Sequence, residues 1–378
     1  MVSAVILAVL VQDKQYQPVF PKLFPRPTSA NGLEEYVRAL DIVHGQQLAT
    51  KYFDVEATPE ETLDLKLKCA SETDAVARLI EQGNAKPLDY PPGHTAKAIE
   101  DLSYNIYVVG RVLWRRGEGL LALGRTDEGF AQFEALLVMG RRIGHLGTLL
   151  TYLRGRSILN YGLNGYHDYR THMPLPFTKR LDALSVDLLQ PTLLEECLQR
   201  DNEATDELMA EAIAEAGIVR AAQEFLGVER DLGDERTLTR EYEKWLEFYR
   251  SQTRLVLKAD EANWSREIDR IFVGNQEEMP PGQAMAHGLM NLRPDILRLE
   301  LRQRAQIRML RLYGKIAEYR WLNGTYPAQL EQVGTPTERT DPLTGQEFHY
   351  ANQGESFDLY SSGIPELGEI RVRYRRAN

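Results

Sequence analysis

The chain has 378 residues, a net charge of −10 and a sequence pI near 5.4. Its hydrophobic share of 43% and its charged share of 26% are ordinary for a globular protein. The acidic balance argues against a chain that grips nucleic acid or an anionic membrane with its whole surface. Cys69 and Cys197 are too few for a disulfide scaffold or a thiolate zinc site, and two buried thiols are expected in preference to one bridge.

The N-terminus carries an apolar run at residues 2–11, which is too short to cross a bilayer because a helical span needs about 20 residues. The run has the length of a signal-peptide core, but no basic flank precedes it and no small-x-small cleavage site follows it. Three interpretations stay open: a clipped or mis-started signal anchor, an export signal, and a buried strand. The next segment, residues 12–28, contains four prolines and is predicted to be an extended, non-helical tether.

Helix signals dominate from Asn31 onward. Asn31 and Glu34 have the spacing of a capping box, and Thr58 is followed by a proline and two carboxylates, which suit the first turn of a helix. Breaks rich in proline or glycine separate the further helical patterns. The sequence predicts helices at about residues 31–48, 58–69, 72–81, 95–124, 128–144, 148–165, from Thr178, and at 191–226, 236–260, 264–272 and 294–323.

Residues 120–136 resemble the turn of a tetratricopeptide hairpin. In that pattern a glycine ends the first helix, and small and aromatic residues of the second helix, here Ala131, Phe133 and Ala135, pack back on it. No 34-residue period extends the match on either side. The prediction is therefore an αα-hairpin, TPR-like in part, inside a mainly α, multi-helix domain.

Two charged lines stand out among the predicted helices. Like charges four residues apart destabilise a helix by about 0.2–0.5 kcal/mol per pair, so each line asks for a partner. We expect the two lines to meet and form structural charge pairs at the edge of a shared core, the alternative being two separately solvated faces. The acidic line is Glu203, Glu207, Glu211 and Glu215, and the basic line is Arg304, Arg308, Arg311 and Lys315.

No familiar catalytic motif and no Glu-x-x-His metal pair occur in the chain, and the basic helix at residues 294–323 lacks the interleaved exposed aromatics of a nucleic-acid site. No cofactor, metal or nucleic acid is therefore predicted. The densest polar and aromatic segment is residues 161–172, which either line a pocket or form a helix C-terminus with tyrosines packed beneath a loop. The candidates for catalysis are His167, Asp168 and His172, and those for binding are Tyr166, Tyr169 and Arg170.

The last part of the chain has the most specific order of features. A long helix at residues 294–323 leads into Asn-Gly-Thr-Tyr-Pro and then Asp-Pro-Leu-Thr-Gly, and alternating aromatic segments follow at residues 348–350 and 357–359. The order resembles the C-terminal segment of type II secretion major pseudopilins, which implies a small antiparallel β module, with residues 370–374 as a third strand. The pilin N-terminal motif and the acidic calcium loop are missing, so neither filament assembly nor calcium binding is carried over.

The whole chain resembles a group of bacterial envelope proteins in which a membrane-proximal N-terminus and a large helical domain precede a pseudopilin-like tail. The stretches that carry this resemblance are residues 31–39, 147–153 and 189–203. The resemblance implies export, and it implies no particular activity.

The sequence thus predicts three parts: an N-terminal segment and tether at residues 1–30, an α-helical domain at 31–323, and a β module at 324–378. The expected function is a non-enzymatic, envelope-associated scaffold or protein-binding subunit within a larger assembly, with a membrane tether at its N-terminus. The first alternative is a hydrolase with a pocket around His167 and Asp168. The second is a soluble cytoplasmic helical protein.

Overall fold

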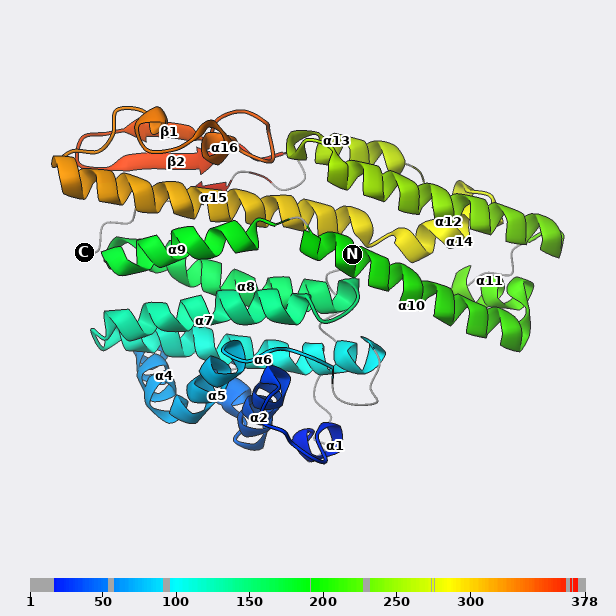
Figure 1. The fold of residues 1–378 in the computed structure, drawn as a ribbon, viewed down its shortest axis with the longest axis horizontal. Coiled ribbons are helices and arrows are strands. Elements are labelled where there is room, and N and C mark those ends of the chain that lie inside the picture. Colours follow the sequence, from blue (N-terminus) through cyan, green and yellow to red (C-terminus); the bar gives the residue numbers. More distant parts are fainter. Residues whose placement is uncertain are drawn as a thin grey trace.

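The computed structural model consists mainly of helices packed in hairpins, which lie in stacked layers with a small sheet along one edge (Figure 1). It describes residues 17–53, 58–90, 96–190, 192–226, 232–272, 274, 276–364, 368 and 370–372. The predicted mainly α fold with a small C-terminal antiparallel sheet is confirmed. The apolar run at residues 2–11 lies outside the described residues.

Short helices form the N-terminal layer. The predicted helix start at Thr58 is confirmed, and Thr58 and Glu61 form a capping box there. At the first predicted helix Asn31 caps the Leu33 amide, whereas Glu34 accepts hydrogen bonds from the preceding loop and so does not complete a capping box. The layer comprises α1 (Phe20–Leu23), α2 (Gly32–Gly45), α3 (Leu48–Phe53), α4 (Pro59–Glu72) and α5 (Asp74–Asn84).

Helix α1 corrects the prediction that residues 12–28 are extended and non-helical. Pro21 lies in the first turn of α1, where a helix needs no amide donor, so the ring is tolerated. The Asp41 carboxylate on α2 accepts hydrogen bonds from the Val19 and Phe20 amides at 2.9 and 3.0 Å. The number of prolines does not show that Pro21 falls at a helix start. It also does not show that the Asp41 carboxylate accepts hydrogen bonds from the free amides there.

A second layer contains the longest hairpin of the first half of the chain. The turn predicted near Gly124 is present, with φ +74 at that glycine. Helix α9 begins three residues before the predicted cap Thr178, with Pro174 at its N-cap and a proline in its first turn. The Thr178 hydroxyl instead donates to the Leu175 carbonyl inside the helix. The layer comprises α6 (Ala96–Ala122), α7 (Thr126–Gly144), α8 (Leu149–Tyr169), the 3-10 turn η2 (Arg170–His172) and α9 (Leu175–Leu188).

The next helices differ from the prediction at two places. Gly217 adopts φ +78 and divides the single helix predicted at residues 191–226 into two. The sequence predicts a break at residues 278–281, but Pro281 occupies the first turn of an additional helix. This part comprises α10 (Thr192–Ala216), α11 (Ile218–Leu226), α12 (Glu235–Lys258), α13 (Glu261–Ile271), the 3-10 turn η3 (Gln276–Glu278) and α14 (Pro281–Met290).

The longest helix of the described chain, α15 (Arg293–Asn323), runs between the helical layers and the C-terminal module (Figure 1). It ends at Gly324, which adopts a left-handed φ of 76°. The module contains the 3-10 turn η4 (Leu330–Gln332), α16 (Pro336–Arg339) and the strands β1 (His349–Asn352), β2 (Phe357–Ser361) and β3 (Ile370–Val372).

The sheet is antiparallel with the order β1-β2-β3, so β2 is its central strand. Tyr350 pairs with Leu359 in the first ladder, and Leu359 pairs with Val372 in the second. Phe357 and Leu359 are buried and belong to the same apolar cluster as Leu312 and Ile316 of α15. The period-2 alternation seen in the sequence therefore points the apolar face of β2 at α15.

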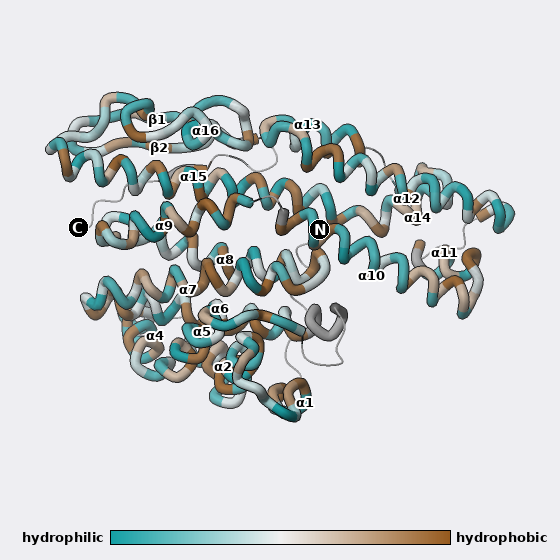
Figure 2. Tube along the Cα trace, in the orientation of Figure 1, coloured by the Kyte–Doolittle hydropathy of each residue, from teal (hydrophilic) through white to brown (hydrophobic). Residues whose placement is uncertain are grey.

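Hydrophobic and hydrophilic residues alternate along most helices, as expected of helices that bury one side (Figure 2). The largest buried cluster joins α10–α15 with the β module, a second lies under the N-terminal layer, and a third lies between α7, α8, α9 and α15. Cys69 and Cys197 are buried free thiols, as expected. None of the described helices combines the length and apolar character that a bilayer-spanning helix requires.

Candidate functional site

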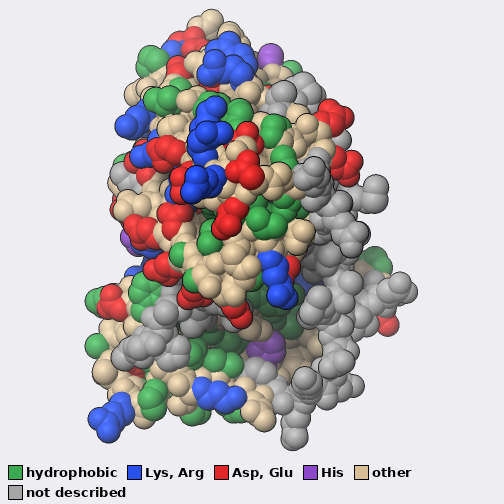
Figure 3. Space-filling model, turned by 90° about the vertical axis from the view of Figure 1, so that its right-hand side faces the viewer, with side chains coloured by type: hydrophobic (Ala, Val, Ile, Leu, Met, Phe, Trp, Pro, Cys, Tyr) green, Lys and Arg blue, Asp and Glu red, His purple; other side chains and the backbone are tan. Residues whose placement is uncertain are grey.

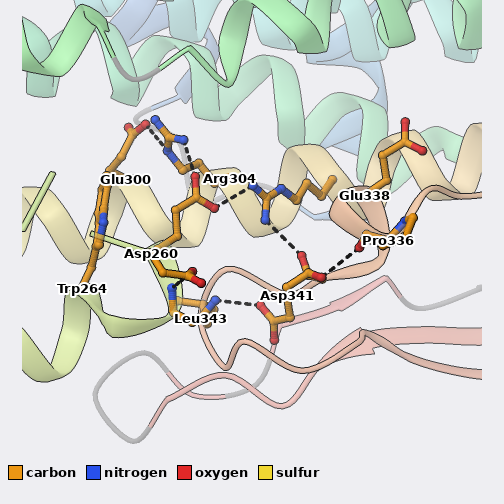
Figure 4. A network of polar contacts seen from close by, with 12 residues as sticks. Asp260, Trp264, Glu300, Arg304, Pro336, Glu338, Asp341 and Leu343 are labelled. Carbon is orange, nitrogen blue, oxygen red and sulfur yellow. Dashed lines mark hydrogen bonds and ion pairs between the residues drawn. The ribbon is translucent and has the colours of Figure 1, made fainter. Parts of the chain in front are cut away.

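A buried carboxylate on α15, Glu300, belongs to a polar network that Figure 4 shows from Glu300 and Arg304 to the C-terminal module. Glu300 forms an ion pair with Arg156 of α8, accepts a hydrogen bond from the Tyr152 hydroxyl, and pairs with Arg304 at 2.8 Å. All of these side chains are almost completely buried. Burial alone would raise the pKa of Glu300, but the two guanidinium groups outweigh it and the pKa is lowered. Glu300 therefore stays ionised inside the core.

The network continues from α15 to α13 and to the C-terminal module. Glu261 at the start of α13 pairs with Arg304 at 2.5 Å and with Arg308 at 2.6 Å. Arg308 also donates to the Thr340 carbonyl at 3.1 Å. The Trp264 ring lies 5.5 Å from the Arg304 guanidinium. Two arginines of α15 thus join three parts of the structure.

The rest of the basic line has carboxylate partners on two other elements. Arg311 pairs with Asp182 of α9 at 2.8 Å and with Glu338 of α16 at 2.9 Å. Lys315 pairs with the same Glu338 at 2.6 Å. The basic line is therefore neutralised by α9, α13, α16 and its own helix.

The predicted pairing of this line with the acidic line of α10 is wrong. All eight side chains lie in the described part of the chain, and no ion pair joins the two lines there. Glu203, Glu207, Glu211 and Glu215 face water. Charge pairing between α10 and α15 occurs at the first turn of α15, where Arg293 lies 3.5 Å from Asp201.

The catalytic candidates do not form a shared site. Asp168 and His172 are exposed, whereas His167 is turned inward and its Nε2 is buried without a hydrogen-bond partner. Burial and the nearby Arg170 lower the pKa of His167 to about 3. A histidine with that pKa is neutral near pH 7 and is poorly suited to general acid–base work.

The binding candidates pack beneath the connection between α8 and α9. Tyr166 is buried in an aromatic cluster with Phe130, and its pKa is raised by burial. Tyr169 donates to Glu118 at 3.0 Å, and Arg170 lies over the Tyr313 ring. These positions fit the helix-terminus interpretation of residues 161–172.

A different surface gathers aromatic side chains that are half-buried. We call it the aromatic row. Tyr107 and Tyr161 bring their rings within 5.6 Å and share a hydrogen bond of 2.5 Å between their hydroxyls. Trp114 stacks on Tyr161 at 5.8 Å and on Phe53 at 6.5 Å. The row consists of Phe53 of α3, Tyr104, Tyr107 and Trp114 of α6, and Tyr161 of α8.

Arginine side chains lie over these rings. Arg111 lies 4.5 Å from the Phe53 ring and Arg154 lies 4.7 Å from the Tyr104 ring. Neither arginine has a carboxylate partner among the described residues. Arg115, by contrast, pairs with Glu118 at 3.0 Å, and Lys66 pairs with the same carboxylate at 3.0 Å. The row thus carries four cationic side chains against one carboxylate, in a chain that is acidic overall.

The aromatic row was not predicted, although part of its signal is visible in the sequence. Tyr104, Tyr107, Arg111 and Trp114 recur every three or four residues and must share one face of a helix. Their neighbours come from α3 and α8, and sequence spacing cannot show which helices lie together.

Comparisons with protein-family models, with curated proteins and with solved structures find no match to this chain. The site must therefore be interpreted from its own geometry. Among the described residues, no group of three or more His, Cys, Asp or Glu side chains is arranged to hold a metal ion.

The substitution Glu300→Gln tests the buried network. It leaves Arg156 and Arg304 buried without their shared counter-charge, so we expect a loss of about 3–5 kcal/mol in the free energy of unfolding, measured by urea denaturation. Glu224→Gln removes an exposed pair with Arg220 and should cost less than about 1 kcal/mol. Equal, small losses for both variants would show that the network does not hold α15 in place.

Acid should destabilise the fold through His167. Its folded pKa of about 3 lies below the ordinary value of 6.5, so the unfolded chain binds a proton that the folded chain refuses. The stabilisation is complete above pH 6.5 and is lost as the pH falls toward 3, by at most about 1.4 kcal/mol per pH unit. Urea denaturation from pH 7 to pH 4.5 should show a shallower loss for His167→Gln than for wild type. The exposed control His172→Gln should keep the wild-type slope, and an unchanged slope in His167→Gln would contradict the assignment.

Proposed function

We propose that the protein is a non-enzymatic, envelope-associated scaffold or subunit that binds another protein through the aromatic row. The observation that carries the proposal is the row itself, where Trp114 and two tyrosines stand beside Arg111 and Arg154 at a half-exposed surface. Tryptophan, tyrosine and arginine are the residues most enriched at the energetic centres of protein interfaces.

The rings of the aromatic row are already packed in place in the unbound protein. Tyr107, Trp114 and Tyr161 contact one another, and they pack against the buried cluster beneath the N-terminal layer. Side chains that are already ordered lose little conformational entropy on binding, which favours affinity. Flat aromatic surface supplies the apolar contact, while the guanidinium groups supply the polar one.

The charge of the row indicates the chemistry of the partner. Arg111 and Arg154 lie on aromatic rings and pair with no carboxylate among the described side chains, so a partner segment with carboxylates would supply a counter-charge. The chain as a whole has a net charge of −10 and repels an acidic protein at long range. The local excess of positive charge on the row would then fix where such a partner docks.

The scaffold part of the proposal is supported by the architecture. The helical layers and the β module are joined through α15 by the ion pairs of Glu300, Glu261 and Glu338. A frame of this kind presents a surface in a fixed orientation. The envelope assignment is supported by the apolar run at residues 2–11 and by the resemblance to bacterial envelope proteins.

Charge reversal on the row tests the function. The variant Arg111→Glu/Arg154→Glu removes no ion pair of the part of the chain that the structure describes, so its stability should stay close to that of wild type. We expect affinity isolation from the native host to recover a defined partner with wild type, and the variant to bind that purified partner at least about tenfold more weakly.

The control is Arg266→Glu/Arg270→Glu, which makes the same change of charge at two exposed side chains of α13, far along the chain from the row. It should bind like wild type. Recovery of the same partner with equal affinity by all three proteins would refute the proposal that the row is the docking surface.

A further inference from the structure

A hollow of about 500 Å³ is lined by residues of α10, of α12 and of the first turn of α15. Helices α10 and α12 lie at the other end of the fold from α4 and α5 (Figure 1). Its volume falls in the range of pockets that hold small organic ligands. Its basic wall side chains are Arg250, Arg254, Lys258 and Arg293, and its acidic ones are Glu195 and Glu247.

Arg293 is the deepest of these cations, with only 2% of its surface exposed. Its guanidinium donates to the Asn202 side chain at 2.5 Å and lies 3.5 Å from the Asp201 carboxylate, while Nε has no partner. Burial lowers the pKa of Arg293 to about 10, because the loss of hydration outweighs the nearby Asp201 carboxylate, and the charges of Arg250 and Arg254 oppose part of the effect of Asp201. The buried charge is therefore incompletely compensated.

The other three cations follow one another every four residues along α12. Arg250 forms a bidentate pair with Asp206 at 2.7 and 3.1 Å, and Arg254 pairs with Glu247 at 2.8 Å near the rim. Lys258 is exposed and has no ion pair within the described residues. Like charges at this spacing destabilise a helix, so a further anion bound in the hollow would stabilise this arrangement.

The hollow also has an apolar side. Leu198 of α10 and Leu257 of α12 are among its lining residues. The end of the molecule formed by α11 and its neighbours shows acidic and basic side chains interspersed, with no single-sign field (Figure 3). Selection for an anion would therefore come from the local arrangement inside the hollow.

We propose that this hollow binds a small organic anion, whose phosphate or carboxylate group contacts Arg254, Lys258 and Arg293 and whose apolar part contacts Leu198 and Leu257. Guanidinium groups recognise both kinds of oxyanion through paired hydrogen bonds. The proposal does not depend on protein binding at the aromatic row.

Calorimetric titration of the full chain with phenyl phosphate, inorganic phosphate and citrate, at constant ionic strength, tests the proposal. We expect saturable binding, with phenyl phosphate tighter than inorganic phosphate because it also fills the apolar side, or citrate bound through its carboxylates. The variant Arg254→Gln/Lys258→Gln changes two exposed side chains and should weaken the binding at least about tenfold.

The matched control is Arg240→Gln/Lys244→Gln, which removes the same charge from the same helix outside the hollow. It should bind within about twofold of wild type. Equal weakening in both variants would show that net charge alone causes the effect, and this would contradict the proposed site. The absence of saturable binding for all three probes would also contradict it. A melting temperature within about 2 °C of wild type would confirm that both variants are folded.

Discussion

The structure depends on one carboxylate, Glu300, which is buried between two guanidinium groups. Removing three charges from water costs several kcal/mol per ion, so such a group is stable only where its partners are placed with little freedom. Here Arg156 of α8 and Arg304 of α15 supply the charge, and the Tyr152 hydroxyl supplies a further hydrogen bond. The requirement fixes how α15 lies against α8. The other ion pairs of α15 then set the positions of α9, α13 and the C-terminal module.

Because most charges around α15 are paired, arginines whose positive charge is not fully neutralised by a carboxylate are informative. Arg111 and Arg154 lie on aromatic rings, and Arg293 is buried beside two further arginines. The first arrangement is a half-buried surface whose composition suits a protein partner, and the second is a hollow whose volume suits a small molecule. An excess of positive charge thus supports a protein ligand at the aromatic row and a small anion in the hollow.

Local signals in the sequence predicted the helices well, because a cap, a first-turn proline or a left-handed glycine acts within a few residues. The helix start at Thr58, the turn at Gly124 and the alternating strand at Phe357 are examples. The partners of the basic line could not be predicted in this way. Spacing shows that Arg304 and Arg308 share a helix face, but their common partner Glu261 lies more than forty residues away. The aromatic row was missed for the same reason.

Native-state hydrogen exchange of the full chain would test most directly whether α15 and its buried ion pairs unite the structure. If they do, the amides of β2, of residues 301–316 in α15 and of α8 should exchange through openings of equal free energy, and Glu300→Gln should lower all of them together. The account would be contradicted if β2 exchanged through a separate opening of lower free energy while α15 kept its full protection.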